Sequence, residues 1–369
     1  MRVSLIGYEA NVKNRVGSNQ YAFELIKALY QLDYKNQYHV YLPSLPLPDL
    51  PKERKNWHYR VVGPPRLWNF FGLPRALFQQ RPKPDLVFNP GHYCPLFTPA
   101  PLVVSIMDLG YLRYPHQFTK PILAKLKFWT LLSIKRAVHI LAISKSTKND
   151  IIRYYGLEPD KIKITYPGYD KEKFKKQEAR GKIEEVKRKY KIKQNYILFL
   201  GTLKPNKNIE GLLQAFARLG EKNLQLVVAG RKGWMFKTIF EKVKKLGLGK
   251  QVIFTGFIEE GDVPVLMSGA EVFVMPSFWE GFGIPAIEAM ACGTPVVVSN
   301  AGSLPEIVGE AGAVVNPYDV KDIARGIRAA MENREKLIKK GFKQSRQFSW
   351  KKCAQETLKI LERTGGENV

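Results

Sequence analysis

Short runs of β-branched and apolar residues alternate with longer segments of helical periodicity along most of this chain. Between the runs at 3–7 and 38–42, apolar side chains recur every three or four positions over residues 18–32, which is the period of one helix face. Parallel strands buried between helices give this alternation. The sequence therefore predicts an α/β protein built on parallel sheets. The strands expected are residues 3–7, 38–42, 59–62, 86–88, 102–106, 140–143, 162–166, 196–201, 224–229, 252–254, 272–275, 295–298 and 313–315.

A polar, lysine-rich stretch over residues 170–194 interrupts the alternation, which resumes at 196. The 369 residues also exceed the ~250–300 at which a single core stops growing. We expect two facing, doubly wound Rossmann-like domains, with ligands at the carboxyl ends of their strands. The expected divisions are an N-terminal domain over 1–168, a linker with one charged helix over 169–195, a C-terminal domain over 196–349, and a helix over 350–369 that packs back toward the N-terminal domain.

The composition excludes several classes of protein. With 45% hydrophobic and 25% charged residues, the chain is not a disordered one. No run approaches the ~18 apolar residues of a membrane-spanning helix, and the opening residues MRVSLIG read as a buried strand, so no signal peptide is expected. Cys94, Cys292 and Cys353 are far apart and lack CxxC spacing, which indicates a reducing compartment and no structural zinc.

The formal net charge of +26 indicates a polyanionic partner, which could be nucleic acid, an anionic membrane or a phosphorylated ligand. No acidic residue occurs over 86–107 or over 109–149, and residues 171–193 hold eleven Lys or Arg against four Glu. For residues 171–193, a solvated face within a charged linker is an equal alternative. The basic residues of the second acid-free stretch are Arg113, Lys120, Lys125, Lys127, Lys135, Arg136, Lys145 and Lys148.

The densest constellation of candidate site residues spans 276–295, where a strand, a glycine-rich loop and a helix follow one another. Gly281 and Gly283 allow the backbone to approach a ligand closely, and the helix beginning near Ile284 presents N–H groups that can receive a diphosphate. Glu280 in the loop and Glu288 one turn into the helix can contact different hydroxyls of one ligand. The alternative interpretation is a solvent-exposed surface pair.

These residues resemble the E-x7-E motif of the retaining family-4 glycosyltransferases, which have the GT-B fold. Glu280 and Glu288 lie in E-G-F-G-x-P-x-x-E-A-M-A-C-G-x-P-V-V, and the resemblance covers most of the chain. The other matching blocks are Gly201 to Asn208, Val227 to Gly230, Phe254 to Phe257, Gly302 to Glu306, Gly17 to Tyr21, and Asp108.

The resemblance implies a role for each matching residue. The catalytic residues would be Glu280, Lys207 and Asp108, and the donor-binding residues would be Gly17, Thr202, Lys204, Lys207, Phe257, Ile258, Glu280, Phe282, Gly283, Ile284 and Glu288. Glu288 would hold the ribose of a nucleotide sugar, Glu280 the transferred sugar and Lys207 the diphosphate. Phe257 and Ile258 would line the base pocket. Taken alone, Lys207 also fits a solvated lysine at a helix start.

Three residues depart from the family pattern. Thr202 stands where many members have an arginine, so that one phosphate cation is absent or is supplied by Lys204. Asn19 replaces the second glycine of the first loop. Met107 stands where many members have a histidine that contacts the donor sugar. This departure concerns the chemistry of the sugar pocket and does not affect the nucleotide site. For Asp108, capping of the following turn is an equal alternative to a role in catalysis.

The chain contains no DxD, no HExxH and no Cys/His cluster with ligand spacing, so neither a metal nor another cofactor is expected. In GT-B enzymes, helix N-termini and Lys or Arg generally stabilise the leaving diphosphate. By the resemblance, the reaction retains anomeric configuration through front-face attack, with the leaving phosphate accepting the acceptor's proton.

Acceptor recognition would belong to the N-terminal domain, where residues 64–78 and 120–136 mix cations with large aromatic side chains. Cations are attracted to an anionic leaflet and aromatic side chains favour the interface. We therefore expect a cytoplasmic protein that attaches reversibly to the inner face of the cell membrane. The alternative is that these aromatic side chains belong to the core.

The function expected is hexosyl transfer from a GDP- or UDP-linked sugar to a glycan or lipid-linked acceptor, in polysaccharide or cell-envelope biosynthesis. Residues 230–234 resemble members that use GDP-mannose. The alternatives are another GT-B enzyme (an inverting transferase or a nucleotide-sugar epimerase), an inactive relative, and a polyanion-binding protein. No recognisable nucleic-acid-binding module is present in the sequence, so nucleic acid is not expected as a partner.

Overall fold

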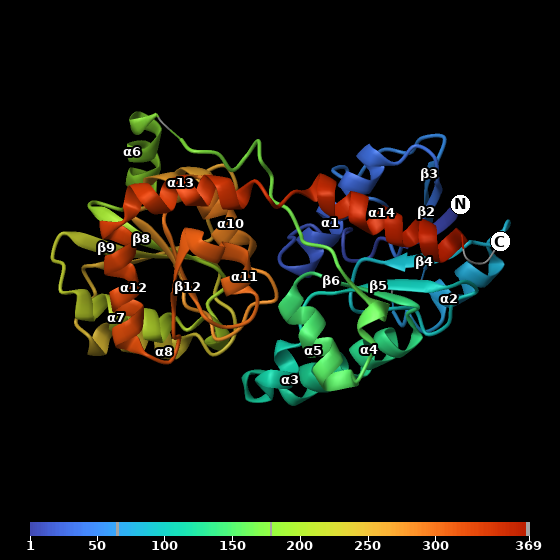
Figure 1. Ribbon diagram of the computed structural model, residues 1–369, viewed down its shortest axis with the longest axis horizontal. Helices are drawn as coiled ribbons and strands as arrows, with labels where there is room; N and C mark the ends of the chain where they lie inside the picture. The colour runs from blue at the N-terminus through green and yellow to red at the C-terminus, as the bar shows by residue number, and fades with distance from the viewer. Residues whose placement is uncertain (64–65, 178, 367–369) are drawn as a thin grey trace. The chain divides into compact units, whose positions relative to one another are not determined.

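The computed structural model describes residues 1–63, 66–177 and 179–366. The chain divides into two compact units. The N-terminal unit comprises Met1–Gly168 together with the segment from Ser349 onward, and the C-terminal unit comprises Tyr169–Phe348. Both are α/β units built on a parallel sheet (Figure 1), which confirms the predicted fold class. Pro64, Pro65, Glu178 and residues 367–369 lie outside the described residues.

The sheet of the N-terminal unit has seven parallel strands in the order β3-β2-β1-β4-β5-β6-β7. Its inner strands are buried on both faces, as Leu86–Asn89 and Leu102–Ile106 show, because helices cover the two sides of a parallel sheet. The strands are β1 Arg2–Ile6, β2 Gln37–Leu42, β3 Trp57–Val61, β4 Leu86–Asn89, β5 Leu102–Ile106, β6 His139–Ala142 and β7 Ile162–Ile164. The helices are α1 Ser18–Leu32, α2 Gly72–Gln79, α3 Gly110–Arg113, α4 Lys120–Arg136, α5 Lys145–Tyr155 and α14 Trp350–Gly366.

The last helix, α14, belongs to the N-terminal unit and packs on α1 (Figure 1). The rings of Tyr21 and Trp350 lie 5.8 Å apart, edge to face, and Thr364 is hydrogen-bonded to His139 at the far end of α14. At the point where the chain leaves this unit and returns to it, a Cβ on Gly168 would lie 2.1 Å from the Trp350 nitrogen. Only glycine allows the two segments to approach this closely.

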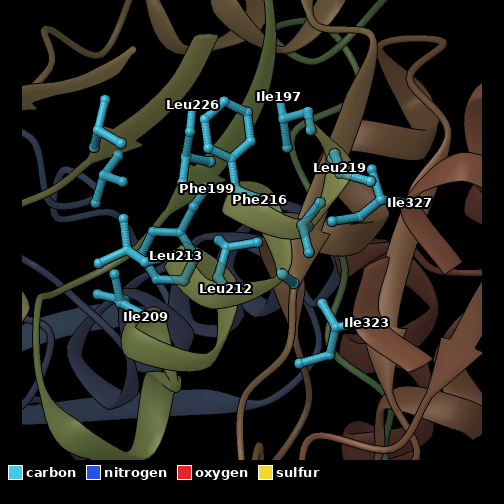
Figure 2. Close-up of a cluster of buried hydrophobic side chains, with 14 of the residues drawn as sticks. Ile197, Phe199, Ile209, Leu212, Leu213, Phe216, Leu219, Leu226, Ile323 and Ile327 are labelled. Carbon is cyan, nitrogen blue, oxygen red and sulfur yellow. The ribbon is translucent and has the colours of Figure 1, made fainter. Parts of the chain in front are cut away.

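The C-terminal unit has a six-stranded parallel sheet in the order β10-β9-β8-β11-β12-β13. Figure 2 shows its core, in which α7 and α12 contribute side chains such as Phe216 and Ile327 that pack against Ile197, Phe199 and Leu226 of the sheet. The strands are β8 Asn195–Leu200, β9 Leu224–Ala229, β10 Val252–Gly256, β11 Val272–Met275, β12 Val296–Ser299 and β13 Gly312–Val315. The helices are α6 Arg180–Lys189, α7 Ile209–Leu219, α8 Lys237–Lys245, α9 Val263–Gly269, α10 Ile284–Ala291, α11 Leu304–Val308, α12 Val320–Glu332 and α13 Arg334–Ser345.

Each sheet reverses its strand order once. The reversal lies between β1 and β4 in the N-terminal unit and between β8 and β11 in the C-terminal unit. Connections leave such a point in opposite directions, so a crevice forms beyond the carboxyl ends of the two strands, and ligands of this fold class bind there. Among the described residues, no helix is both long and apolar enough to cross a bilayer.

Candidate functional site

The candidate site lies at the strand reversal of the C-terminal unit, where β8 and β11 pair in parallel through Val272 and Ile197. After β8 the chain continues as a loop into a short 3₁₀ turn, Pro205–Lys207, that leads to α7. After β11 it runs through the glycine-rich loop at 276–283 into α10. Because both loops begin at the same sheet edge, the motifs around Lys207 and Glu280 meet there.

Lys207 and Glu280 form an ion pair across these two loops, with 2.5 Å between Nζ and Oε1. Both side chains are largely buried, with 15% of Lys207 and 14% of Glu280 exposed. The surface-pair alternative is therefore wrong for Glu280, and the solvated-lysine alternative is wrong for Lys207. The structure places a cation and a carboxylate together at the sheet edge where a phosphorylated ligand is expected.

The backbone around Glu280 is held from two sides. On one side, the Phe278 N–H donates to the Asn206 carbonyl oxygen at 2.8 Å. On the other side, the backbone N–H and the hydroxyl of Ser303 both donate to the Glu280 carbonyl oxygen at 3.1 Å. Gly302 lies so close that a Cβ on it would be 2.4 Å from that oxygen. These contacts fix the direction in which the Glu280 side chain leaves the loop.

The start of α10 is the element at which the sequence predicts that an anion binds. Gly283 has a φ of +104° at the N-cap, and a Cβ there would lie 2.5 Å from a methyl carbon of Leu304, so the position needs glycine. Phe282 is buried and packs edge to face on Phe348, with ring centroids 5.7 Å apart. Pro285 has no N–H, and the Ala286 N–H donates to the Gly283 carbonyl oxygen at 3.0 Å. Since the first N–H groups of a helix have no partner within it, the Ile284 N–H is the group at this helix start that can receive an oxygen of a bound anion.

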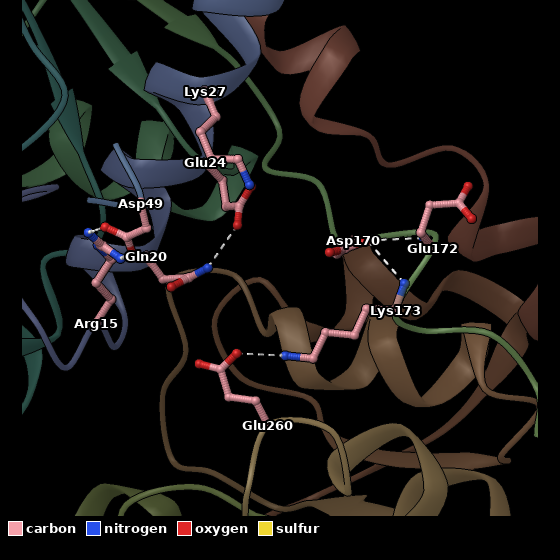
Figure 3. Close-up of polar contacts among 9 residues, drawn as sticks. All are labelled: Arg15, Gln20, Glu24, Lys27, Asp49, Asp170, Glu172, Lys173 and Glu260. Atoms are coloured by element: carbon pink, nitrogen blue, oxygen red, sulfur yellow. Dashed lines mark hydrogen bonds and ion pairs between the residues drawn. The ribbon is translucent and has the colours of Figure 1, made fainter. Parts of the chain in front are cut away.

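Glu288 lies in a different electrostatic environment from Glu280. Burial raises the pKa of Glu288 to about 8; Lys173 opposes this shift and Asp170 adds to it. Figure 3 shows Asp170 accepting the backbone N–H groups of Glu172 and Lys173, and Lys173 paired with Glu260 at 3.2 Å. Near neutral pH the Glu288 carboxyl is therefore mostly protonated, and it can donate one hydrogen bond and accept others from a diol.

The residues expected around the nucleotide follow β8, β9 and β10, next along the same sheet edge. Gly230, with a φ of +143°, lies so close to the Gly201 carbonyl oxygen that a Cβ would be 2.0 Å from it. The Arg231 guanidinium carbon lies 4.4 Å from the centre of the Phe257 ring, which is 58% exposed. Ile258 is buried and contributes no exposed side chain to this edge.

Thr202 and Lys204 lie in the loop between β8 and the 3₁₀ turn, and both are half-buried. The Leu203 N–H donates to the Arg231 carbonyl oxygen at 2.9 Å, which ties this loop to the one after β9. The Lys204 Nζ lies 5.1 Å from the centre of the Trp234 ring. Lys204 is thus held beside the aromatic residue of the 230–234 segment.

Two of the predicted site residues, Gly17 and Asp108, belong to the N-terminal unit. Gly17 has a φ of +55° and precedes α1. Asp108 Oδ1 accepts the Gly110 N–H at 2.8 Å, so its carboxylate makes the turn contact that was the structural alternative for this residue.

Two polar residues near the sheet edge of the N-terminal unit were not predicted from the sequence. His92 Nε2 accepts the N–H of Met107 at 3.1 Å, so a histidine from the loop after β4 lies beside the position where the family pattern has one. Glu9, which follows β1, accepts hydrogen bonds from Ser18 and Asn19, and burial raises its pKa. The sequence feature that could have pointed to His92 is that it is the one histidine in the acid-free stretch 86–107.

Residues 1–63, 66–177 and 179–366 contain no group of three or more His, Cys, Asp or Glu side chains arranged to hold a metal ion. The cations and helix N–H groups of the C-terminal unit described above can interact favourably with negative charge on a ligand.

Two parallel α/β units, with a lysine–glutamate pair and a glycine-capped helix at the strand reversal of the second, define a GT-B protein of the family-4 type. Two family models match the chain: Glycosyltransferase Family 4 over residues 16–173 and Glycosyl transferases group 1 over residues 182–344. The chain belongs to this family.

Among curated proteins, the O-antigen chain mannosyltransferase B of Escherichia coli is 36% identical over 233 residues, which are 61% of this chain and 61% of that protein. The match thus spans about three-fifths of the relative's length. Among solved structures, sucrose-phosphate synthase from Thermosynechococcus elongatus has a TM-score of 0.77 at 20% identity, covering 98% of both chains. HepE of Anabaena in complex with UDP and glucose has a TM-score of 0.75 at 20% identity, covering 98% of this chain and 99% of HepE. These two structures share the fold.

Proposed function

We propose that this protein transfers a hexose, and specifically mannose, from a nucleoside-diphosphate sugar to a glycan or lipid-linked acceptor with retention of anomeric configuration. The observation that carries the proposal is the Lys207–Glu280 pair at the strand reversal, beside the N-terminus of α10. The sugar assignment is supported by the mannosyltransferase relative from Escherichia coli.

The pair suits a donor with a diphosphate on one side and a sugar on the other. When the donor binds, Lys207 turns its ammonium group to the β-phosphate, and Glu280 is left to accept hydrogen bonds from the sugar hydroxyls. As the bond between the anomeric carbon and the β-phosphate oxygen breaks, negative charge develops on the diphosphate. Lys207 and the α10 N–H groups stabilise that charge more strongly than they stabilise the intact donor, which is the condition for catalysis.

Retention follows if the acceptor oxygen attacks from the face on which the diphosphate leaves. The acceptor hydroxyl then forms the new bond to the anomeric carbon, and its proton passes to the departing phosphate oxygen. In this scheme no side chain has to form a covalent intermediate. We propose that the step needs no metal, because Lys207 and the start of α10 supply positive potential where the diphosphate would lie.

We propose guanine as the base of the donor. The Arg231 guanidinium lies over the exposed ring of Phe257 and makes no hydrogen bond or ion pair with another described residue. A stacked guanidinium keeps its in-plane N–H groups free, and two of them can pair with the adjacent O6 and N7 acceptors of guanine. Uracil offers a single acceptor on the equivalent edge, so GDP-linked sugars are the proposed donors.

We place the protein on the cytoplasmic face of the cell membrane, attached peripherally and acting in the synthesis of envelope polysaccharide. The basic and aromatic segments of the N-terminal unit support this location, and a lipid-linked acceptor is the substrate class that goes with it.

A panel of nucleotide sugars, assayed for nucleotide release with and without EDTA, tests donor and metal use together. NMR of the product with GDP-mannose as donor then reports the anomeric configuration. Retained configuration in EDTA supports the proposal. An inverted linkage indicates an inverting GT-B enzyme, and a modified nucleotide sugar without transfer indicates an epimerase. Oligonucleotide binding without nucleotide-sugar binding would indicate a polyanion-binding protein.

A further inference from the structure

The outer surface of α4 carries apolar side chains where solvent would favour polar ones. Ala124, Phe128 and Leu131 recur at helical spacing on the exposed side of this helix, with Phe128 49% and Leu131 39% exposed. The inward side is also apolar, since Trp129 and Ile134 are buried. A helix that is apolar on both sides needs a second apolar environment beyond its own core.

Aromatic side chains from the segment before α2 extend this surface. Phe70 stacks on Phe128 with ring centroids 6.5 Å apart and lies 5.0 Å from the Trp129 ring. The next residue, Phe71, is 69% exposed and lies 6.4 Å from Phe70. Leu67, in the same segment, is 58% exposed. The core alternative from the sequence therefore holds for Trp129 and is wrong for Phe71 and Phe128.

Positive charge surrounds the apolar residues. Lys120, Lys127 and Lys135 lie on the outward side of α4 in register with Phe128 and Leu131, and all three are exposed. The Arg136 guanidinium lies 5.5 Å from the ring of Phe97, which is itself 55% exposed. Over residues 54–149 the chain has fifteen Lys or Arg and only two acids, Asp85 and Asp108, so this surface has little negative charge to balance it.

We define the α4 face as the apolar residues Leu67, Phe71, Phe97, Phe128 and Leu131 together with the cations Arg66, Lys127, Lys135 and Arg136. We propose that the α4 face docks on an anionic lipid leaflet, with α4 lying in the plane of the interface. Each cation near such a leaflet contributes about 1 kcal/mol, and exposed aromatic rings favour the headgroup level. The proposal deepens the proposed function, since it names the surface through which a lipid-linked acceptor is reached.

The α4 face is continuous with the strand reversal of the N-terminal unit. The Tyr93 ring lies 6.0 Å from Trp129, and the Nζ of Lys125 on α4 lies 5.0 Å from the centre of the Tyr93 ring. The charge of Glu9 raises the pKa of Tyr93 further than burial alone does. A row of aromatic rings thus leads from the lipid-facing surface to Glu9, and docking brings the acceptor's headgroup to that edge.

Co-sedimentation with phosphatidylcholine vesicles, with and without phosphatidylglycerol, tests the proposal on the full chain. We expect salt-sensitive binding to the anionic vesicles. Lys127→Ala with Lys135→Ala removes two charges and should weaken binding about 30-fold. Phe128→Ser with Leu131→Ser should weaken it about tenfold or more. The matched controls are Leu45→Ser, at a leucine 77% exposed in the same unit, and Lys336→Ala with Lys339→Ala on α13; both should bind as wild type does.

Nucleotide release from GDP-mannose, measured on the same preparations, separates this proposal from the proposed function. Variants of the α4 face that release nucleotide as wild type does are correctly folded. A loss of vesicle binding in these variants therefore supports docking through the α4 face. A wild-type protein that releases nucleotide but does not bind anionic vesicles would contradict membrane docking through the α4 face. The proposed transferase activity would be unaffected by that result. Variants of the α4 face that bind vesicles as wild type does would also contradict the docking proposal. Salt-sensitive oligonucleotide binding that the same variants abolish would contradict it as well.

Discussion

The ammonium group of Lys207 lies 2.5 Å from the carboxylate of Glu280. Each partner neutralises the charge of the other. Under the proposed function, a donor that separates them replaces one ion pair by two new sets of contacts, to phosphate and to sugar. Because the pair is largely buried, removing only one partner leaves the other charge poorly solvated, and this shapes the mutational predictions for both residues.

We predict that Glu280→Gln lowers kcat by on the order of 10²-fold or more with a smaller change in KM, because the carboxylate acts mainly in the transition state. Steady-state kinetics with GDP-mannose check the prediction. The matched control is Glu310→Gln, which removes an exposed carboxylate paired with Lys340 and should leave kcat unchanged. Equal kcat values for the two variants would contradict the role given to Glu280.

Replacing Lys207 by methionine should weaken GDP binding and lower kcat together, because in the proposed mechanism the ammonium group contacts the diphosphate both before and during transfer. The double variant with Glu280→Gln should lose less activity than the two single losses combined, since each single change strands a buried charge. A double-mutant cycle in kcat/KM measures this coupling. Simple additivity would show that the two residues do not act through one ligand.

The raised pKa of Glu288 predicts a pH-dependent stability of the unliganded protein. Between about pH 4.5 and 8 the folded state holds a proton on Glu288 that the unfolded chain has released, so stability falls as pH rises through this window and levels off above it. Glu288→Gln should flatten the profile, with a difference on the order of a few kcal/mol across the window. Thermal melting at several pH values checks this. An unchanged profile would place the Glu288 carboxyl in water.

Gly302→Ala should lower both stability and kcat, because the added Cβ would lie 2.4 Å from the Glu280 carbonyl oxygen at a φ of +63°. The contact must displace the backbone of Glu280, which carries the partner of Lys207. Gly261→Ala is the matched control, since a Cβ there would meet nothing within 4 Å and the backbone is not in the left-handed region. Gly302→Ala should have both a lower melting temperature and a lower kcat than Gly261→Ala.

Much of the fold could be predicted because strand and helix patterns are local. The expected strands at 102–106, 224–229 and 272–275 match β5, β9 and β11, and the helix start at Ile284 is the observed start of α10. These segments have the length and apolar content that their burial on both faces of a parallel sheet requires.

The pairing of Lys207 with Glu280 could not be predicted from the sequence, although both residues were identified. The two lie 73 positions apart, and they meet only because β11 pairs with β8 instead of extending the sheet beyond β10. The contact of His92 with Met107 depends in the same way on β4 and β5 being neighbours. Local sequence patterns do not determine strand order, so they do not identify which side chains from different loops lie in contact.

The close passage of Gly168 beside Trp350 makes the C-terminal unit an insertion, in topological terms, within the chain of the N-terminal unit. Both ends of that insertion start from one spot. The whole C-terminal unit can therefore be exchanged for another by recombination at two neighbouring breakpoints, while α14 stays packed on the N-terminal unit. Under the proposed function, new sugar specificities can arise by exchange of the C-terminal unit, with the N-terminal unit left unchanged.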